Sequence, residues 1–88
     1  MSSPAYAVVV NRSARKEIRS LDAAMRLRVI RELRALSTNP RPPGCRKLSG
    51  ARDRWRVRVG DYRIIYTIDD AGRLVEIAAV SHRSKAYE

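Results

Sequence analysis

A change of hydrophobic period at residues 40–44 constrains the fold of this chain more than any other feature. Before this Pro-Arg-Pro-Pro-Gly stretch, apolar residues recur at helical spacing; after it, they alternate with polar residues, as in a half-buried strand. Proline and glycine interrupt both helices and strands, so the stretch separates a helical half from a strand half. With 88 residues there is room for one small domain, which we place at residues 1–88.

The N-terminal half predicts one strand followed by two helices. The β-branched run at residues 6–10 is long enough for a strand. Ser13 and Asp22 are candidate N-caps for the two helices, and Asn39-Pro40 is expected to end the second one. The second helix carries an apolar stripe formed by Met25, Val29, Leu33 and Leu36.

The C-terminal half predicts three strands. Two alternating runs, 55–59 and 62–66, flank Gly60-Asp61, a pair typical of a two-residue hairpin turn. A continuous apolar run at 74–80 predicts a buried strand. The order β-α-α-β-β-β predicts an α+β domain: an N-terminal strand and a two-helix hairpin, with the helices on one face of a small, mainly antiparallel sheet, and a short C-terminal tail or helix.

The hairpin turn also fixes which side chains share a face. If Gly60 and Asp61 are the two loop residues, Arg58 lies opposite Arg63. Cross-strand partners share a face, and so do residues two apart along a strand. Arg56, Arg58 and Arg63 are therefore expected on one face. The other face collects the apolar residues, which we expect to pack against the helices: Trp55, Val57, Tyr62, Ile64 and Tyr66.

Two interpretations of this arginine cluster are open. The three side chains are solvated residues of an arginine-rich chain, or they bind an anion. Like charges directly opposite one another cost stability, and guanidinium groups bind phosphate bidentately, so we favour an anion site. The formal net charge of +10, from 19 Lys and Arg against nine Asp and Glu, indicates a polyanionic partner, most simply a nucleic acid.

The sequence lacks the residues that several classes of reaction require. The sequence has no paired carboxylates, no phosphate-binding glycine loop and a single cysteine, Cys45, which excludes a disulfide framework and a multi-cysteine zinc site. We therefore expect neither cofactor nor metal. Metal-independent RNA cleavage remains, in which the 2′-OH attacks the adjacent phosphate. It requires cations around the phosphorane, a base for the 2′-OH and stabilisation of the 5′ leaving oxygen.

Three segments together resemble a known family. They are the KLxG element at 47–50, the hairpin RVGDYRIIY at 58–66 and the closing HRxxxY at 82–87. The chain resembles the RelE branch of the RelE/ParE toxin superfamily over nearly its whole length. The resemblance implies a ribosome-dependent mRNA endoribonuclease of a type II toxin–antitoxin system, which cuts message in the ribosomal A site and inhibits translation. The ParE branch shares the fold and inhibits DNA gyrase without catalysis, which is the alternative. A third option is a nucleic-acid-binding domain acting as a repressor within an antitoxin complex.

The resemblance also implies roles for individual arginines. The two sheet cations of the family fall on Arg56 and Arg58, where the best-known members have lysines. The phosphate-binding arginine falls on Arg63, and the arginine near the leaving group on Arg83. The exchange of lysine for arginine keeps the charge but replaces a possible proton donor with a group that stays protonated.

Two further residues are candidates for proton transfer. The family's C-terminal tyrosine falls on Tyr87, the candidate general base, and nearby arginines would lower the pKa of its phenol by favouring the phenolate. Tyr87 would otherwise pack the C-terminal tail onto the sheet. His82 is the candidate proton donor, because histidine is a common general acid at neutral pH, or else it is a solvent-facing residue at a strand end.

The partners expected are a cognate antitoxin, with an acidic segment wrapping the toxin, and the ribosome with its mRNA and ribosomal RNA. Operator DNA is expected only through the antitoxin complex. No apolar run is long enough to span a membrane and no secretory signal is visible, so we expect a cytoplasmic protein. Seven helix arginines either contact ribosomal RNA or form solvated faces: Arg12, Arg15, Arg19, Arg26, Arg28, Arg31 and Arg34.

Overall fold

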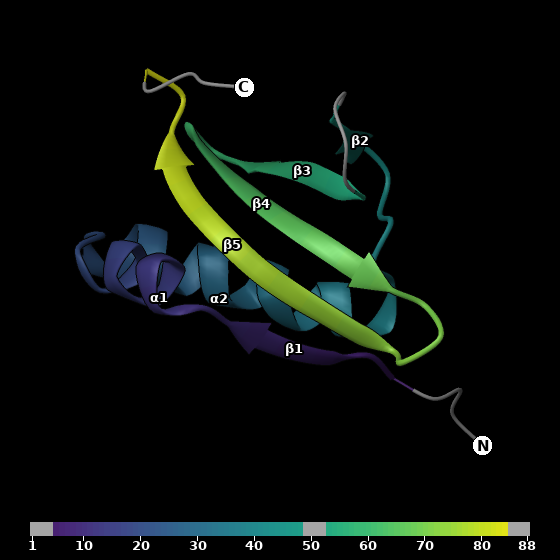
Figure 1. Ribbon diagram of the computed structural model, residues 1–88. Coiled ribbons are helices and arrows are strands. Elements are labelled where there is room, and N and C mark those ends of the chain that lie inside the picture. The colour runs from purple at the N-terminus through teal and green to yellow at the C-terminus, as the bar shows by residue number, and fades with distance from the viewer. Residues whose placement is uncertain (1–4, 49–52, 85–88) are drawn as a thin grey trace.

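The computed structural model describes residues 5–48 and 53–84, which form two helices and a five-stranded sheet (Figure 1). The elements in chain order are β1 (Ala7–Val10), α1 (Arg12–Arg19), α2 (Ala23–Thr38), β2 (Arg46–Lys47), β3 (Arg54–Val59), β4 (Tyr62–Asp69) and β5 (Leu74–His82). The predicted α+β class and the strand–helix–helix opening are confirmed. The sequence did not predict β2, because two consecutive charged residues carry no strand pattern.

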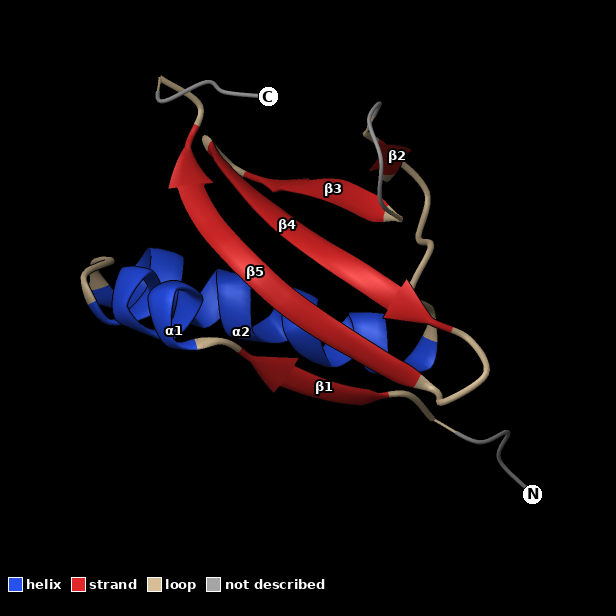
Figure 2. Cartoon of the chain, viewed as in Figure 1, coloured by secondary structure: helices blue, strands red, loops and turns tan. Residues whose placement is uncertain are grey.

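The sheet is mainly antiparallel, with the strand order β1-β5-β4-β3-β2. Among the described strands only β1 and β5 pair in parallel, so β1 lies beside β5 at an edge of the sheet. Both helices cover the same face, and the opposite face is left open (Figure 2). The strands therefore present one row of side chains to the helices and the alternate row to the open face.

The first helix begins earlier than the sequence predicts. The Asn11 side-chain Oδ1 accepts a hydrogen bond from the backbone N–H of Ala14 at 2.8 Å, so Asn11 is the N-cap of α1. The prediction that Ser13 caps this helix is wrong, because Ser13 already lies in the first turn. Asparagine and serine are both good caps, and the sequence contains the two within three residues.

The second helix has the predicted ends. Asp22 Oδ1 accepts from the backbone N–H of Met25 at 2.8 Å, and α2 ends at Thr38, directly before Asn39-Pro40. Val29, Leu33 and Leu36 of the predicted stripe are buried, and Met25 packs partly buried against them. Neither described helix is long and apolar enough to cross a membrane.

The core lies between the helices and the covered face of the sheet. Tyr66 and Ile64 are fully buried there and Val57 is 6% exposed, while Trp55 and Tyr62 are half-buried against the same cluster. The predicted apolar face of the hairpin is thus confirmed. The buried Tyr66 hydroxyl donates to the carbonyl of Pro40 at 2.8 Å, which ties the Pro-rich loop to β4.

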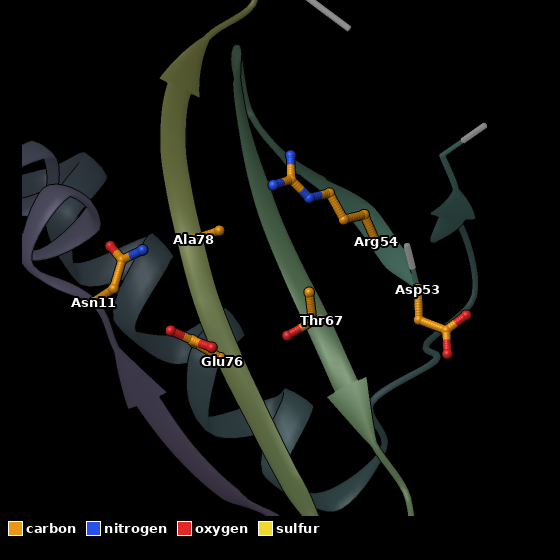
Figure 3. A pocket seen from close by; sticks show the side chains of 6 residues that line it. All are labelled: Asn11, Asp53, Arg54, Thr67, Glu76 and Ala78. Carbon is orange, nitrogen blue, oxygen red and sulfur yellow. The ribbon is translucent and has the colours of Figure 1, made fainter. Parts of the chain in front are cut away.

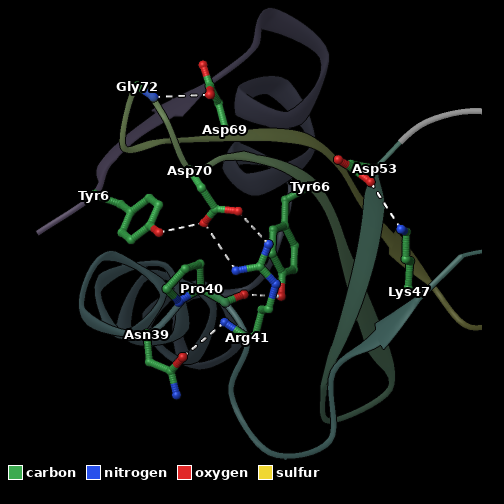
Figure 4. Close-up of polar contacts among 10 residues, drawn as sticks. All are labelled: Tyr6, Asn39, Pro40, Arg41, Lys47, Asp53, Tyr66, Asp69, Asp70 and Gly72. Carbon is green, nitrogen blue, oxygen red and sulfur yellow. Dashed lines mark hydrogen bonds and ion pairs between the residues drawn. The ribbon is translucent and has the colours of Figure 1, made fainter.

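A polar network joins three segments beside the β4–β5 turn (Figure 4). Asp70, in the β4–β5 turn, accepts hydrogen bonds from both terminal nitrogens of Arg41, at 3.2 and 2.8 Å, and from the Tyr6 hydroxyl at 2.6 Å. The guanidinium of Arg41 also lies 5.1 Å from the ring centre of Trp55. The bonds from Arg41, and then from Tyr6, lower the pKa of Asp70 to about 2.

Candidate active site

The β3–β4 hairpin has the register that its sequence predicts. Arg58 is the direct cross-strand partner of Arg63, and Gly60 adopts a positive φ of 60° in the turn. A two-residue turn of this kind favours glycine because other residues are strained at positive φ. Since Val57 and Val59 face the core, Arg58 and Arg63 lie on the open face of the sheet.

The two paired arginines meet a third at a small hollow beside the turn. The hollow has a volume of about 160 Å³ and is lined by Arg58, Arg63 and Arg83 together with residues 60–62. The Nε of Arg63 is buried and has no hydrogen-bond partner among the described residues. A buried donor without a partner is costly to folding. Three guanidinium groups around one hollow are suited to holding an anion through their N–H groups.

Arg83 is held at the hollow by the backbone. Its N–H donates to the carbonyl of Asp61 at 2.8 Å, directly after β5 ends. The Arg83 Nε lies 3.6 Å from Asp61 Oδ1, and the two side chains are 70% and 67% exposed. Exposed ion pairs contribute little, so the Arg83 side chain can exchange this carboxylate for a phosphate at low cost.

Arg56 lies on the same open face, two residues further from the turn. It is half-buried and is the cross-strand partner of Ile65. The structure thus places Arg56 in line with Arg58 along β3, although Arg56 does not line the hollow.

His82 lies on the other side of the sheet. It is the cross-strand partner of Tyr62, and the two rings make an edge-to-face contact with centres 5.1 Å apart. Because Tyr62 packs against the core, His82 shares the helix-covered side, and it lines a separate hollow of about 350 Å³ that also includes Glu17. Its Nδ1 accepts from the backbone N–H of Ser84 at 3.1 Å. The structure does not bring His82 to the arginine cluster, and proton donation by it stays a prediction.

Tyr87 lies outside the described residues, as do residues 49 and 50 of the KLxG element. The role of Tyr87 as a general base therefore stays a prediction as well.

The helix arginines divide into two groups. Arg26 is half-buried and donates to the carbonyl oxygens of Leu21, at 2.7 Å, and Arg19, at 3.3 Å, so it stabilises the turn between the helices. The others are exposed and remain candidates for RNA contact: Arg12, Arg15, Arg19, Arg28, Arg31 and Arg34.

Sequence reasoning missed a larger hollow on the open face (Figure 3). It has a volume of about 610 Å³ and is lined by Asn11, Asp53, Arg54, Thr67, Glu76 and Ala78. These residues come from four separate segments, and the parallel pairing of β1 with β5 is what brings Asn11 to the others. The available signal was Glu76, a charged residue that interrupts an otherwise apolar strand.

No group of three or more His, Cys, Asp or Glu side chains that could hold a metal ion occurs within residues 5–48 and 53–84.

The fold and the arginine cluster together define a small basic α+β protein with three arginines around one hollow on an open sheet face. The model of the family described as the ParE toxin of the type II toxin-antitoxin system, parDE, matches residues 8–87, and the chain belongs to this family. It is accordingly a toxin of a type II toxin–antitoxin system, within the RelE/ParE superfamily that the sequence motifs resemble.

Solved structures of RelE toxins are similar to this chain throughout. The archaeal RelE–RelB complex from Pyrococcus horikoshii OT3 matches with 29% identity and a TM-score of 0.82, covering 92% of this chain and 98% of that one. The RelBE2 toxin–antitoxin complex from Mycobacterium tuberculosis matches with 28% identity and a TM-score of 0.80, covering 92% and 94%. The isolated RelE toxin of E. coli matches with 25% identity and a TM-score of 0.76, covering 88% and 83%. No curated protein sequence matches the chain.

Proposed function

We propose that this toxin is a ribosome-dependent, metal-independent mRNA endoribonuclease that cuts message in the ribosomal A site. The proposal is supported above all by one observation: Arg58, Arg63 and Arg83 line one hollow beside the β3–β4 turn. Three guanidinium groups at a single hollow suit a phosphate whose negative charge increases in the transition state. The similarity to RelE toxins supports the same activity.

The reaction proposed is attack of the RNA 2′-OH on its own 3′-phosphate. The 2′-oxygen–phosphorus bond forms and the bond from phosphorus to the 5′-oxygen breaks, which leaves a 2′,3′-cyclic phosphate and a 5′-OH. Arg63 binds the phosphate, while Arg58 and Arg56 stabilise the phosphorane. Tyr87 accepts the 2′-OH proton, and Arg83 stabilises charge on the leaving oxygen, which is protonated from water because His82 lies on the other side of the sheet. Binding in the ribosome supplies the in-line geometry.

The whole of residues 1–88 acts as a single toxin domain in this proposal, working in the cytoplasm where translating ribosomes are found. Its other partner is an antitoxin, because two of the similar structures are toxin–antitoxin complexes with RelB proteins. A net charge of +10 favours an acidic antitoxin segment that folds as it wraps the toxin. Operator DNA is contacted only through that complex, and no membrane is involved.

Inhibition of DNA gyrase is the second candidate function. It is favoured by one observation, the match of the chain to the ParE family model over residues 8–87. A gyrase binder without catalytic activity does not require three arginines at one hollow. Cleavage of an RNA phosphodiester, in contrast, needs cations around the phosphorane. For this reason we place it second.

Two parallel assays separate these functions. The purified toxin is added to a translating ribosome extract, where intact and cut message are resolved, and to a gyrase supercoiling reaction. The nuclease proposal predicts cut message and unchanged supercoiling. Intact message with inhibited supercoiling would contradict it in favour of gyrase.

A further inference from the structure

The larger hollow on the open face lies on the same β3–β4 ladder as the arginine cluster. Arg54 and Arg58 are four residues apart on β3, a separation of about 13 Å. Both side chains point to the open face, as their even spacing requires. A strand of RNA bound at Arg58 and Arg63 therefore has this hollow within reach of a neighbouring nucleotide.

The width of the hollow is set by the register. Arg54 is the cross-strand partner of Thr67, and Thr67 is the partner of Glu76. Neighbouring strands lie about 4.8 Å apart, so the backbones at Arg54 and Glu76 are about 10 Å apart with the small Thr67 between them. Figure 3 shows Arg54 on β3 at one side of the hollow and Glu76 and Asn11 at the other side, with Thr67 between Arg54 and Glu76.

A β-bulge in β5 lies at the base of the hollow. The β4–β5 register passes from Ile65 opposite Ala79 to Tyr66 opposite Ile77, so Ala78 is the additional residue. Bulges are frequent beside functional sites, where they redirect side chains. Here the bulge residue Ala78 contributes only a methyl group, so the base of the hollow holds two small side chains, those of Ala78 and Thr67, and a flat ring can approach the sheet.

Some polar groups of the hollow have hydrogen-bond or ion-pair partners and others do not. Asp53 pairs with Lys47 at 3.2 Å, and the Asn11 oxygen caps α1, which leaves the Asn11 amide nitrogen to donate. The side chains of Glu76 and Arg54 make no hydrogen bond or ion pair within the described ranges 5–48 and 53–84. The hollow therefore offers an unpaired acceptor on one side and an unpaired donor on the other.

Only some ligands fit that arrangement. A phosphate is disfavoured, because the Glu76 carboxylate would repel it. A nucleobase is neutral and planar, and the edges of an unpaired base are free for hydrogen bonding. Guanine offers N–H donors at N1 and N2 to a carboxylate and acceptors at O6 and N7 to an arginine. Adenine lacks this donor pair.

We propose that the hollow between Arg54, Thr67 and Glu76 is a base-binding subsite that selects guanine in single-stranded RNA. Glu76 accepts from guanine N1–H and N2–H, and Arg54 donates to O6 and N7. The subsite determines which nucleotide near the cleaved phosphate is preferred. The inference thus rests on the proposed function for its biological role, although binding itself does not require cleavage.

The test uses short oligonucleotides that cannot be cleaved. Pentamers of 2′-O-methyluridine carry one central guanine, adenine or hypoxanthine, which lacks the N2 amino group, and binding to the full chain is measured by fluorescence anisotropy. We expect the guanine pentamer to bind about tenfold more tightly than the other two. Glu76→Gln should abolish this preference, and because it removes a charge that repels phosphate, it should bind the adenine pentamer as tightly as the wild type or more tightly. Glu32→Gln, on α2, should keep it.

Arg54→Gln is the second variant, should Glu76→Gln fold poorly. It should lose the guanine preference and also bind every pentamer more weakly, because a cation is removed. Equal binding of guanine and adenine by the wild type, or a preference that survives both substitutions, would overturn the subsite. Glu76-dependent binding of an arginine-containing peptide without any base preference would overturn it in favour of a protein ligand. A guanine preference together with uncut message on ribosomes would support the subsite and contradict only the nuclease proposal.

Discussion

Arg58 and Arg63 are direct cross-strand partners on the open face of the sheet, where two guanidinium groups face each other beside a two-residue turn. Like charges in this position repel one another across the hairpin. A buried Arg63 nitrogen without a partner among the described residues adds to the cost. We infer that folding alone does not explain this arrangement, whereas phosphate binding does.

Replacing Arg63 by glutamine should separate function from stability. Loss of one transition-state contact to phosphate should slow cleavage by about two orders of magnitude, equivalent to about 3 kcal/mol. Relief of the repulsion should leave the free energy of unfolding unchanged or raise it by up to about 1 kcal/mol. Single-turnover cleavage and denaturant unfolding measure the two quantities. Lys16→Gln, which also removes one exposed cation and lies on α1, is the matched control. A clear loss of stability with a near-normal rate would indicate a structural arginine.

The ion pair between Asp61 and Arg83 should contribute little to folding. Both side chains are largely exposed and their nearest atoms are 3.6 Å apart. Asp61→Asn should therefore change the free energy of unfolding by less than about 0.5 kcal/mol. Because it releases the Arg83 side chain, it should keep or raise the cleavage rate, whereas Arg83→Gln should lower it by about two orders of magnitude. If Asp61→Asn lowered the cleavage rate as much as Arg83→Gln does, the expectation would be contradicted, because the ion pair itself would then be required for cleavage.

Asp70 should make stability depend on pH in the acid range. Arg41 and Tyr6 lower its pKa from 3.8 to about 2, so its ionised form is favoured by folding. The resulting stabilisation is present above about pH 4 and is lost as the pH falls through 2. The Tm of Asp70→Asn should lie below that of the wild type at pH 7, and the difference should disappear near pH 2. Tyr6→Phe should move the loss to higher pH. A Tm difference that is constant from pH 7 to 2 would contradict the assignment.

The N-cap of α1 provides a stability prediction with an internal control. Asn11→Ala should lower the free energy of unfolding by about 1 kcal/mol, because the N–H of Ala14 loses its acceptor. Ser13→Ala should have almost no effect, since Ser13 lies inside the helix. Chemical denaturation of both variants measures the difference. A larger loss for Ser13→Ala would restore Ser13 as the cap.

The elements predicted correctly are those controlled by local physics. The hairpin register follows from Gly60-Asp61, because a two-residue turn leaves only one pairing for Arg58 and Arg63. The end of α2 follows from Asn39-Pro40 in the same way. These local rules are sufficient to place the arginines of the hairpin on one face of the sheet.

The features that were missed depend on contacts between distant segments. The bulge at Ala78 is hidden within the continuous apolar run of β5, so the alternation of faces along that strand was not predicted. His82 consequently lies on the helix side, opposite Tyr62, rather than with the arginines. The hollow near Glu76 requires the parallel pairing of β1 with β5, which no local pattern indicates.

Cleavage by the RNA's own 2′-OH is tested with a ribosome-bound message that carries a single 2′-deoxynucleotide at the position cut in the all-ribose message. Primer extension and end-group analysis map the products. Attack by the 2′-OH predicts discrete A-site cuts with 2′,3′-cyclic phosphate ends in the all-ribose message and no cut at the deoxy position, because the attacking hydroxyl is absent there. Cleavage that continues at the deoxy position, or an all-ribose message that stays intact with the active toxin, would contradict it.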